Sequence, residues 1–132
     1  MRYIEPFVKQ DLAKKMVFVG GPRQVGNTTI AQHILARTTG RYFNWDYDVD
    51  RQAVLGQQWP DDAPLLVFDE LHKFPRWKNW LKRIYDVQKD RHSILVTGSA
   101  RLDMYRRSGD TMLGRYHYWR CTPTRLTSFR TE

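Results

Sequence analysis

Residues 20–29 read GGPRQVGNTT, which is one residue away from a phosphate-binding loop. The loop pattern is G-x-x-x-x-G-K-[ST]; Gly21, Gly26 and Thr28 stand where it requires them, but Asn27 occupies the lysine position. In such a loop, backbone N–H groups surround the phosphates at the N-terminus of a helix, and the threonine hydroxyl contacts Mg²⁺. The segment therefore predicts phosphate binding, with a plain strand-to-helix turn as the alternative. Because Asn27 offers a neutral amide in place of a charge, we expect hydrolysis to suffer more than binding.

Two carboxylates, Asp69 and Glu70, directly follow the apolar run at residues 65–68. In a nucleotide hydrolase, an aspartate at the end of such a strand holds hydrated Mg²⁺, and the adjacent glutamate orients or deprotonates the attacking water. Adjacent carboxylates repel each other, and a bound cation would relieve that repulsion. An acidic pair that only caps the next segment is the alternative, but its position on a separate apolar run downstream of the glycine loop favours the magnesium role.

A third polar group follows another apolar run, in SILVTGS at residues 93–99. A hydroxyl of Thr97 or Ser99 could sense the γ-phosphate or the attacking water, and an ordinary turn around Gly98 is the alternative. His72 and Lys73 are interpreted as surface loop residues rather than ligands. No spacing of His or Cys resembles a zinc site, so we expect no metal other than magnesium.

These residues need strands to position them, and short apolar runs supply the candidates. Runs rich in Val, Ile and Phe that end in glycine or acidic residues are typical of buried parallel strands. The sequence predicts such strands at 16–20, 65–70 and 93–99, a strand of mixed character at 41–46, and an edge-like strand at 115–121.

Helical segments separate the strands. The glycine loop is followed by a helical repeat that Gly40 is expected to cap, and a second amphipathic helix follows Pro75; their apolar positions are Ile30, Ala31, Ile34 and Leu35, then Trp77, Trp80, Leu81, Ile84 and Tyr85. Strands that alternate with helices predict a parallel α/β sheet, which binds its ligands at the carboxyl ends of the strands. We therefore expect the three polar groups to converge at one edge.

Composition fits one domain over residues 1–132, with 41% hydrophobic residues and a formal net charge of +8. No apolar run is long enough to cross a bilayer, so we expect no membrane partner. The single cysteine, Cys121, has no internal disulfide partner, which favours a reducing cytoplasm. The basic charge favours polyanionic partners, although the arginines are scattered and a solvated basic surface is the simpler interpretation.

Four segments, in this order, resemble a known family: GPRQVGNTT, FDELHKFPRWKNWLKRIYD, LVTGSA and LGRYHYWRCTPTRLTSFRTE. They are similar to the prokaryotic predicted AAA+ ATPases whose loop reads GPRQVGKTT. The likeness spans nearly the whole chain, and YFNWDYDVDR also looks like that family's strand, aspartate and arginine segment. The resemblance implies a P-loop NTPase fold, an AAA+-like three-layer α/β/α sandwich. Its mainly parallel sheet would have about five strands in the order 5-1-4-3-2.

The resemblance also implies ligands and roles for individual residues. The ligand would be ATP or ADP with Mg²⁺, and Thr28 and Asp69 would bind the metal. The catalytic residues would be Glu70, Arg115 and Ser99, with Thr97 as the alternate to Ser99. Arg115 matches an arginine that acts in cis or from a neighbouring subunit, so self-association is left open. The phosphate-binding residues would be Gly21, Pro22, Arg23, Gln24, Val25, Gly26, Asn27, Thr28 and Thr29.

Two departures from the family bear on function. Asn27 puts ATP hydrolysis in doubt, whereas ATP binding is still expected, so whether the chain is an enzyme stays open. Family members look to continue into a C-terminal half beyond LTSFRTE, which implies a truncated product or a fragment. The alternative function is a basic nucleic-acid-binding module on a degenerate P-loop fold, with aromatic residues between arginines that could stack on bases: Tyr105, Tyr116, Tyr118 and Trp119.

Overall fold

Nine helices and strands are defined in the part of the chain that the structure describes. The computed structural model describes residues 10, 12, 16–20, 32, 34–36, 39–88, 91–98, 116–121 and 126–129, the last two ranges by their backbone alone. The elements, in chain order, are β1 (Met16–Gly20), β2 (Arg41–Asn44), α3 (Asp48–Leu55), β3 (Leu65–Asp69), the 3-10 turn η3 (Leu71–Lys73), α4 (Trp77–Gln88), β4 (Ser93–Thr97), β5 (Tyr116–Cys121) and β6 (Leu126–Phe129).

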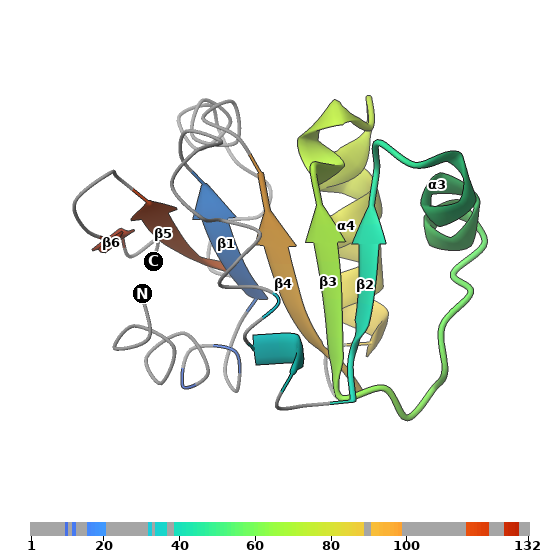
Figure 1. Ribbon diagram of the computed structural model, residues 1–132, viewed down its shortest axis with the longest axis horizontal. Helices are drawn as coiled ribbons and strands as arrows, with labels where there is room; N and C mark the ends of the chain where they lie inside the picture. Colours follow the sequence, from blue (N-terminus) through green and yellow to red (C-terminus); the bar gives the residue numbers. More distant parts are fainter. Residues whose placement is uncertain are drawn as a thin grey trace.

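The strands form one mainly parallel sheet in the order β2-β3-β4-β1-β5-β6 (Figure 1). All neighbouring pairs are parallel except β5 and β6. The predicted α/β class is confirmed, as is the order 1-4-3-2 for the first four strands. The expected count of about five strands was wrong, because residues 126–129 add a sixth, antiparallel strand. The segment at 115–121 was expected at an edge, but β5 pairs with β1 on one side and β6 on the other.

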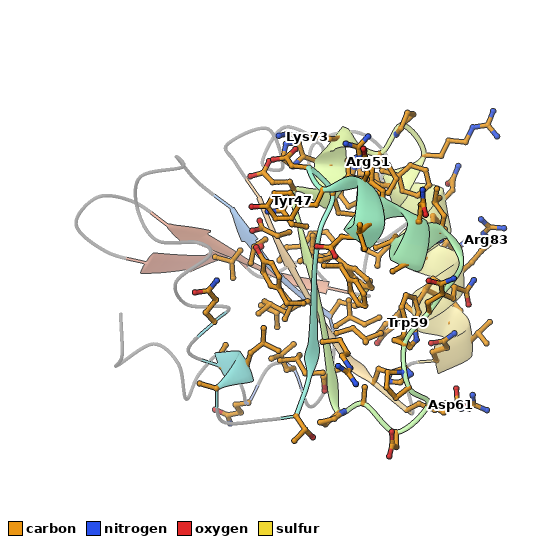
Figure 2. All side chains as sticks on the ribbon, turned by 45° about the vertical axis from the view of Figure 1, so that its right-hand side comes forward. Tyr47, Arg51, Trp59, Asp61, Lys73 and Arg83 are labelled. Atoms are coloured by element: carbon orange, nitrogen blue, oxygen red, sulfur yellow. The ribbon has the colours of Figure 1, made fainter. Side chains whose placement is uncertain are left out.

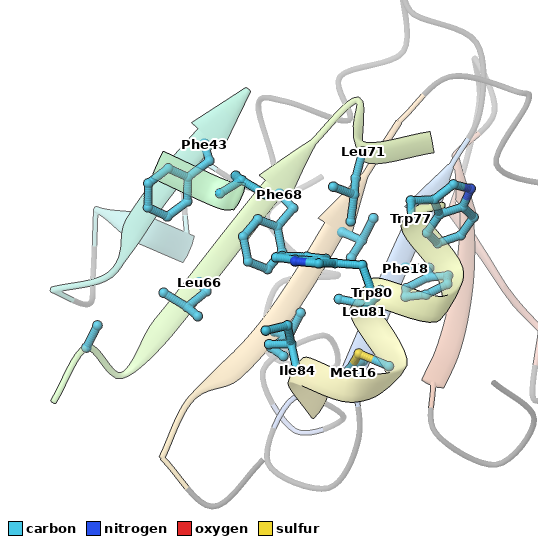
Figure 3. Packing of buried hydrophobic residues seen from close by; sticks show 14 residues of the cluster. Met16, Phe18, Phe43, Leu66, Phe68, Leu71, Trp77, Trp80, Leu81 and Ile84 are labelled. Atoms are coloured by element: carbon cyan, nitrogen blue, oxygen red, sulfur yellow. The ribbon is translucent and has the colours of Figure 1, made fainter. Parts of the chain in front are cut away.

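One face of the sheet is covered by α4, which lies behind β3 and β2 in the view of Figure 1. Four of the five residues of the predicted apolar stripe are buried, namely Trp77, Trp80, Leu81 and Ile84, and the fifth, Tyr85, is partly buried. They pack on alternate strand residues such as Phe18 and Phe68, whose rings lie 5.8 Å from Trp77 and 5.4 Å from Trp80 between centroids (Figure 3). This large apolar contact fixes the sheet against the helix.

The other face is covered by a smaller apolar cluster, called here the opposite-face cluster: Leu12, Val17, Val19, Ile34, Leu65, Val67 and Leu95. Ile34 and Leu35 are helical, in agreement with the predicted helix after the glycine loop, whereas Ile30 and Ala31 lie outside the described residues. Ile34 therefore packs on the same face of the sheet as Val17 and Val19 of β1.

Gly40 does not cap a helix; it lies immediately before β2. A Cβ atom at this position would lie 2.7 Å from the Leu65 carbonyl oxygen and 2.7 Å from Cδ2 of Leu35. Glycine is therefore required because the backbone of β3 and the side chain of Leu35 approach too closely for any larger residue.

No helix in the described ranges has the length and apolar character that a bilayer crossing requires.

Candidate functional site

The carboxyl ends of the central strands lie side by side at one edge of the sheet, where the arrowheads of β1, β4, β3 and β2 point (Figure 1). The register pairs Asp69 with Asn44 on one side and with Thr97 on the other, and pairs Thr97 with Val19. Gly20, the last residue of β1, directly precedes the glycine loop. A row of polar strand ends therefore lies beside the end of β1.

Asp69 is a buried carboxylate, with 4% of its surface exposed. Thr97, fully buried, donates its hydroxyl to Oδ1 of Asp69 at 2.8 Å, and the Tyr42 hydroxyl donates to Oδ2. Burial, followed by the hydrogen bond to Asp69, raises the pKa of Tyr42 above its usual range, so the phenol stays a donor. Two hydroxyl donors thus offset the cost of burying this carboxylate.

Hydrogen bonds between backbones continue past the strand ends. The Glu70 N–H donates to the Thr97 carbonyl at 2.9 Å, and the Trp45 N–H donates to the Asp69 carbonyl at 2.9 Å. The Gly98 N–H donates to the Val19 carbonyl at 3.1 Å. These bonds fix the residues that follow each strand and so give the edge a defined geometry.

Glu70 turns the chain out of the sheet in the left-handed region, with φ 61° and ψ 25°. Few non-glycine residues adopt this conformation, and those that do are often found at functional sites, where the surrounding structure holds the strained backbone in place. The Glu70 carboxylate lies 3.5 Å from Nε2 of His72 and 3.5 Å from Nζ of Lys73. The adjacent carboxylates of Asp69 and Glu70 therefore have different partners: the first contacts the neighbouring strands, and the second contacts its own 3-10 turn.

His72 is buried, with 7% of its surface exposed, so its interpretation as a surface loop residue was wrong. Lys73 is exposed, and its ammonium lies 2.7 Å from Oδ1 of Asp46. The hydrogen bond to Asp46 is the main cause that raises the pKa of Lys73, partial burial opposes it, and the charge of Glu70 adds to it. Lys73 thus joins the loop after β2 to the segment after β3 (Figure 2).

A model of the family described as an AAA domain matches residues 13–130. The chain belongs to this AAA domain family. No curated protein matches the chain closely enough to count as a relative. Membership agrees with the mainly parallel α/β sheet and with the P-loop type of ATPase that the sequence resembles.

In this AAA domain, the structure describes three of the predicted site residues. Asp69, Glu70 and Thr97 lie at the carboxyl edge, on β3, just after it, and on β4. The other predicted residues lie outside the described residues: Gly21, Pro22, Arg23, Gln24, Val25, Gly26, Asn27, Thr28, Thr29, Ser99 and Arg115.

Two residues of this edge were missed by the sequence interpretation, namely Tyr42 and Asp46. Tyr42 is two residues before the end of β2 and packs against the opposite-face cluster, so it points to the same face as Asp69. The sequence contains a signal for Tyr42: side chains alternate along a strand at 41–46, so Tyr42 and Asn44 share one face. Asp46 lies beyond the strand, and its pairing with Lys73 has no local sequence signature.

The chemistry of this edge suits a hard cation. Asp69, Thr97 and Tyr42 supply only oxygen atoms, the ligand type that Mg²⁺ prefers. Among the described residues, no group of three or more His, Cys, Asp or Glu side chains could hold a metal by itself. A magnesium site of the AAA domain at this edge would therefore need Thr28 and nucleotide oxygens in addition to Asp69, as expected for Mg²⁺ bound together with a nucleotide.

Proposed function

We propose that this AAA domain binds ATP or ADP together with Mg²⁺ at the carboxyl edge of its sheet, and that Asn27 weakens its ATP hydrolysis. One observation carries the proposal. Asp69 is a buried carboxylate at the end of the second strand from β1, held by donors from both neighbouring strands. Burying a charge costs free energy unless the charge is paired, and a cation bound together with the nucleotide would pair with the Asp69 carboxylate.

The nucleotide phosphates would lie on residues 21–29, which begin directly after β1. Asp69 and the Thr28 hydroxyl would hold the magnesium, which would neutralise charge on the β and γ phosphates. Thr97 and Tyr42 would keep the Asp69 carboxylate in one orientation by donating to its two oxygens. Backbone N–H groups of the loop need no lysine to bind phosphate, so binding is retained.

Hydrolysis needs further residues. Glu70 would orient or deprotonate the attacking water, Ser99 would sense the γ-phosphate, and Arg115 would stabilise charge in the transition state, from this chain or from a second copy. The amide of Asn27 would replace a lysine that neutralises the transferring phosphoryl group. Loss of one such charge affects the transition state more than the ground state, so turnover should be weak.

Two finer features belong to the same proposal. We infer the three-layer α/β/α arrangement of a P-loop NTPase from the buried apolar clusters on both sheet faces, each of which contains helical residues. We infer a cytoplasmic location from the single cysteine, which suits a reducing compartment.

Titration calorimetry with ATP and Mg²⁺ on this chain and on its Asn27→Lys variant tests the proposal, followed by phosphate release from both. We expect both proteins to bind, with measurable turnover only in Asn27→Lys. Asp69→Asn should lower the affinity for ATP with Mg²⁺ about tenfold or more in either protein and leave magnesium-free binding much less affected.

Asp61→Asn is the matched control, because it makes the same chemical change on an exposed loop away from Lys73 and the carboxyl edge (Figure 2). It should leave nucleotide affinity unchanged. Absence of binding by both the chain and Asn27→Lys would refute the proposed function.

The second candidate function, nucleic-acid binding, is favoured by the exposed side of α4. Lys82 and Arg83 of α4, and Arg76 directly before it, have no ion-pair partner within the ranges that the structure describes, and Asp86 is the only acidic residue of the helix. A polyanion would be attracted to the positive charges of this surface. Oligonucleotide binding that weakens steeply with salt and ignores ATP, and that is reduced by charge reversal at Arg83, would support this alternative over the first.

A further inference from the structure

Glu70 is the proposed water-orienting residue, and its surroundings are unusually well defined for a glutamate in a loop. Its side chain is 13% exposed, and its backbone adopts the left-handed conformation that directs the chain from β3 into η3. A water-orienting carboxylate must lie within hydrogen-bond reach of one water position. A free glutamate side chain samples several rotamers, so a group that restricts it would contribute directly to that requirement.

Lys73 reaches Glu70 with its ammonium group. Its ammonium lies 3.5 Å from Oε2 of Glu70 and 2.7 Å from Oδ1 of Asp46. The shorter contact, to Asp46, anchors the ammonium on the loop after β2. The longer contact then presents the positive charge to Glu70 from a fixed point. The Lys73 side chain is 34% exposed, so water weakens its attraction to Glu70. Lys73 therefore restricts the Glu70 side chain mainly because its ammonium is held in one position.

Asp46 is itself held in place. Its N–H donates to the Asn44 side-chain oxygen at 2.9 Å, and its carbonyl accepts from the Arg51 guanidinium at 3.2 Å. Next to it, the Trp45 ring stacks on Phe74, 4.6 Å between centroids and 9° from parallel. The loop after β2 and the segment after β3 are thus joined by an ion pair and by an aromatic stack.

We propose that Asp46 and Lys73 form a positioning pair that holds the Glu70 carboxylate at the carboxyl edge of the sheet in the orientation needed to direct the attacking water. The inference rests on the proposed function and adds to it two residues, from two different elements. Lys73 acts through Glu70 and touches no reacting atom. Its role is positional, so it should affect the catalytic step more than nucleotide binding.

The contact itself can be measured without nucleotide by following the titration of the Lys73 ammonium with NMR in the full chain. Within the part of the chain that the structure describes, the groups that face Lys73 are Asp46 from the loop after β2 and Glu70 from its own segment, with His72 against the same carboxylate. Asp46→Asn and Glu70→Gln should each shift the Lys73 titration to lower pH. An unchanged Lys73 titration in Glu70→Gln would overturn the proposal.

The catalytic consequence is measured by phosphate release in the Asn27→Lys protein. Lys73→Met should lower kcat about tenfold or more and change KM by less than about twofold, because water orientation is lost while nucleotide contacts remain. Lys73→Arg should recover most of kcat, and Lys82→Met is the matched control. Since Lys73 is exposed, these variants should fold; Asp46→Asn offers a second route to the same loss if Lys73→Met does not.

The outcomes separate this inference from the proposed function. Normal binding and an unchanged kcat in both Lys73→Met and Asp46→Asn would overturn the positioning role alone. No nucleotide binding by any variant, Asn27→Lys included, would overturn the proposed function and this role with it. A fall in kcat that Lys73→Arg does not recover would also count against the role, because packing rather than charge would then explain the loss.

Discussion

Removal of the Thr97 hydroxyl is the most direct test of how Asp69 is held. Thr97→Val keeps the β-branched shape on β4 and removes only the donor that lies 2.8 Å from Oδ1 of Asp69. Both residues are buried, with 0% and 4% of their surfaces exposed, so water has little access to replace the lost bond. We therefore expect the free energy of unfolding to fall by the full value of a hydrogen bond to a charged group, about 1.5–3 kcal/mol.

Ser93→Ala is the internal comparison for this prediction. Ser93 lies on the same strand, and its hydroxyl donates to a neutral acceptor, the Leu12 carbonyl, at 3.2 Å. A neutral bond contributes less, so Ser93→Ala should cost about 0.5–1.5 kcal/mol. Urea unfolding followed by tryptophan fluorescence is the assay, since the midpoints of both variants can be compared at a constant slope.

Tyr42→Phe extends the test to the other carboxylate oxygen. Because Thr97 and Tyr42 donate to the same buried group, losing both should cost more than the sum of the single losses, by about 0.5 kcal/mol or more. The reasoning would be refuted by a Thr97→Val variant that is no less stable than Ser93→Ala, or by single effects that simply add. The first result would mean that the Thr97 hydroxyl does not compensate the burial of Asp69, and the second that the two donors act independently.

Three further predictions concern backbone and charge. Gly40→Ala should destabilise by about 1–3 kcal/mol in thermal unfolding, since its Cβ would lie 2.7 Å from the Leu65 carbonyl oxygen; a neutral result would mean that β3 can move. Glu70→Gly should be more stable than Glu70→Ala by about 1 kcal/mol in urea, because only glycine accepts φ 61° without strain; equal stabilities would contradict this. The raised pKa of Tyr42 contributes stability that is complete below about pH 10 and lost as the pH rises through the folded value, so Tyr42→Phe should lose less on alkaline titration.

The sheet could be predicted because its strands carry a strong local signal. The apolar runs that form β1, β3 and β4 are buried on both faces of the sheet. A strand buried on both faces needs nearly continuous apolar residues, and such a run can be recognised in the sequence. Helix α4 was equally clear, because four of its residues pack on the sheet at helical spacing. In contrast, α3 buries only Val54, and its apolar residues Val49 and Leu55 are exposed, so it has no apolar stripe to detect.

The candidate site could be predicted in part, for a topological reason. Side chains that follow parallel strands must meet at one edge, and this rule located Asp69 and Thr97 without any knowledge of contacts. The partners of these residues come from distant segments: Tyr42 and Asp69 are 27 positions apart, as are Asp46 and Lys73. Such pairings depend on strand register and on the path of each loop, which local patterns do not encode.

The left-handed conformation of Glu70 could not be predicted, and it explains why the edge has its present form. A residue with ordinary β dihedrals would have continued β3 and directed its side chain along the alternation of the strand. The left-handed turn instead brings Leu71 into the core and leaves the Glu70 carboxylate beside Lys73. A strained backbone, a buried carboxylate and a buried histidine are each unfavourable alone. Their concentration at one strand end, where the nucleotide site is proposed, is what we expect if function rather than stability selected these residues.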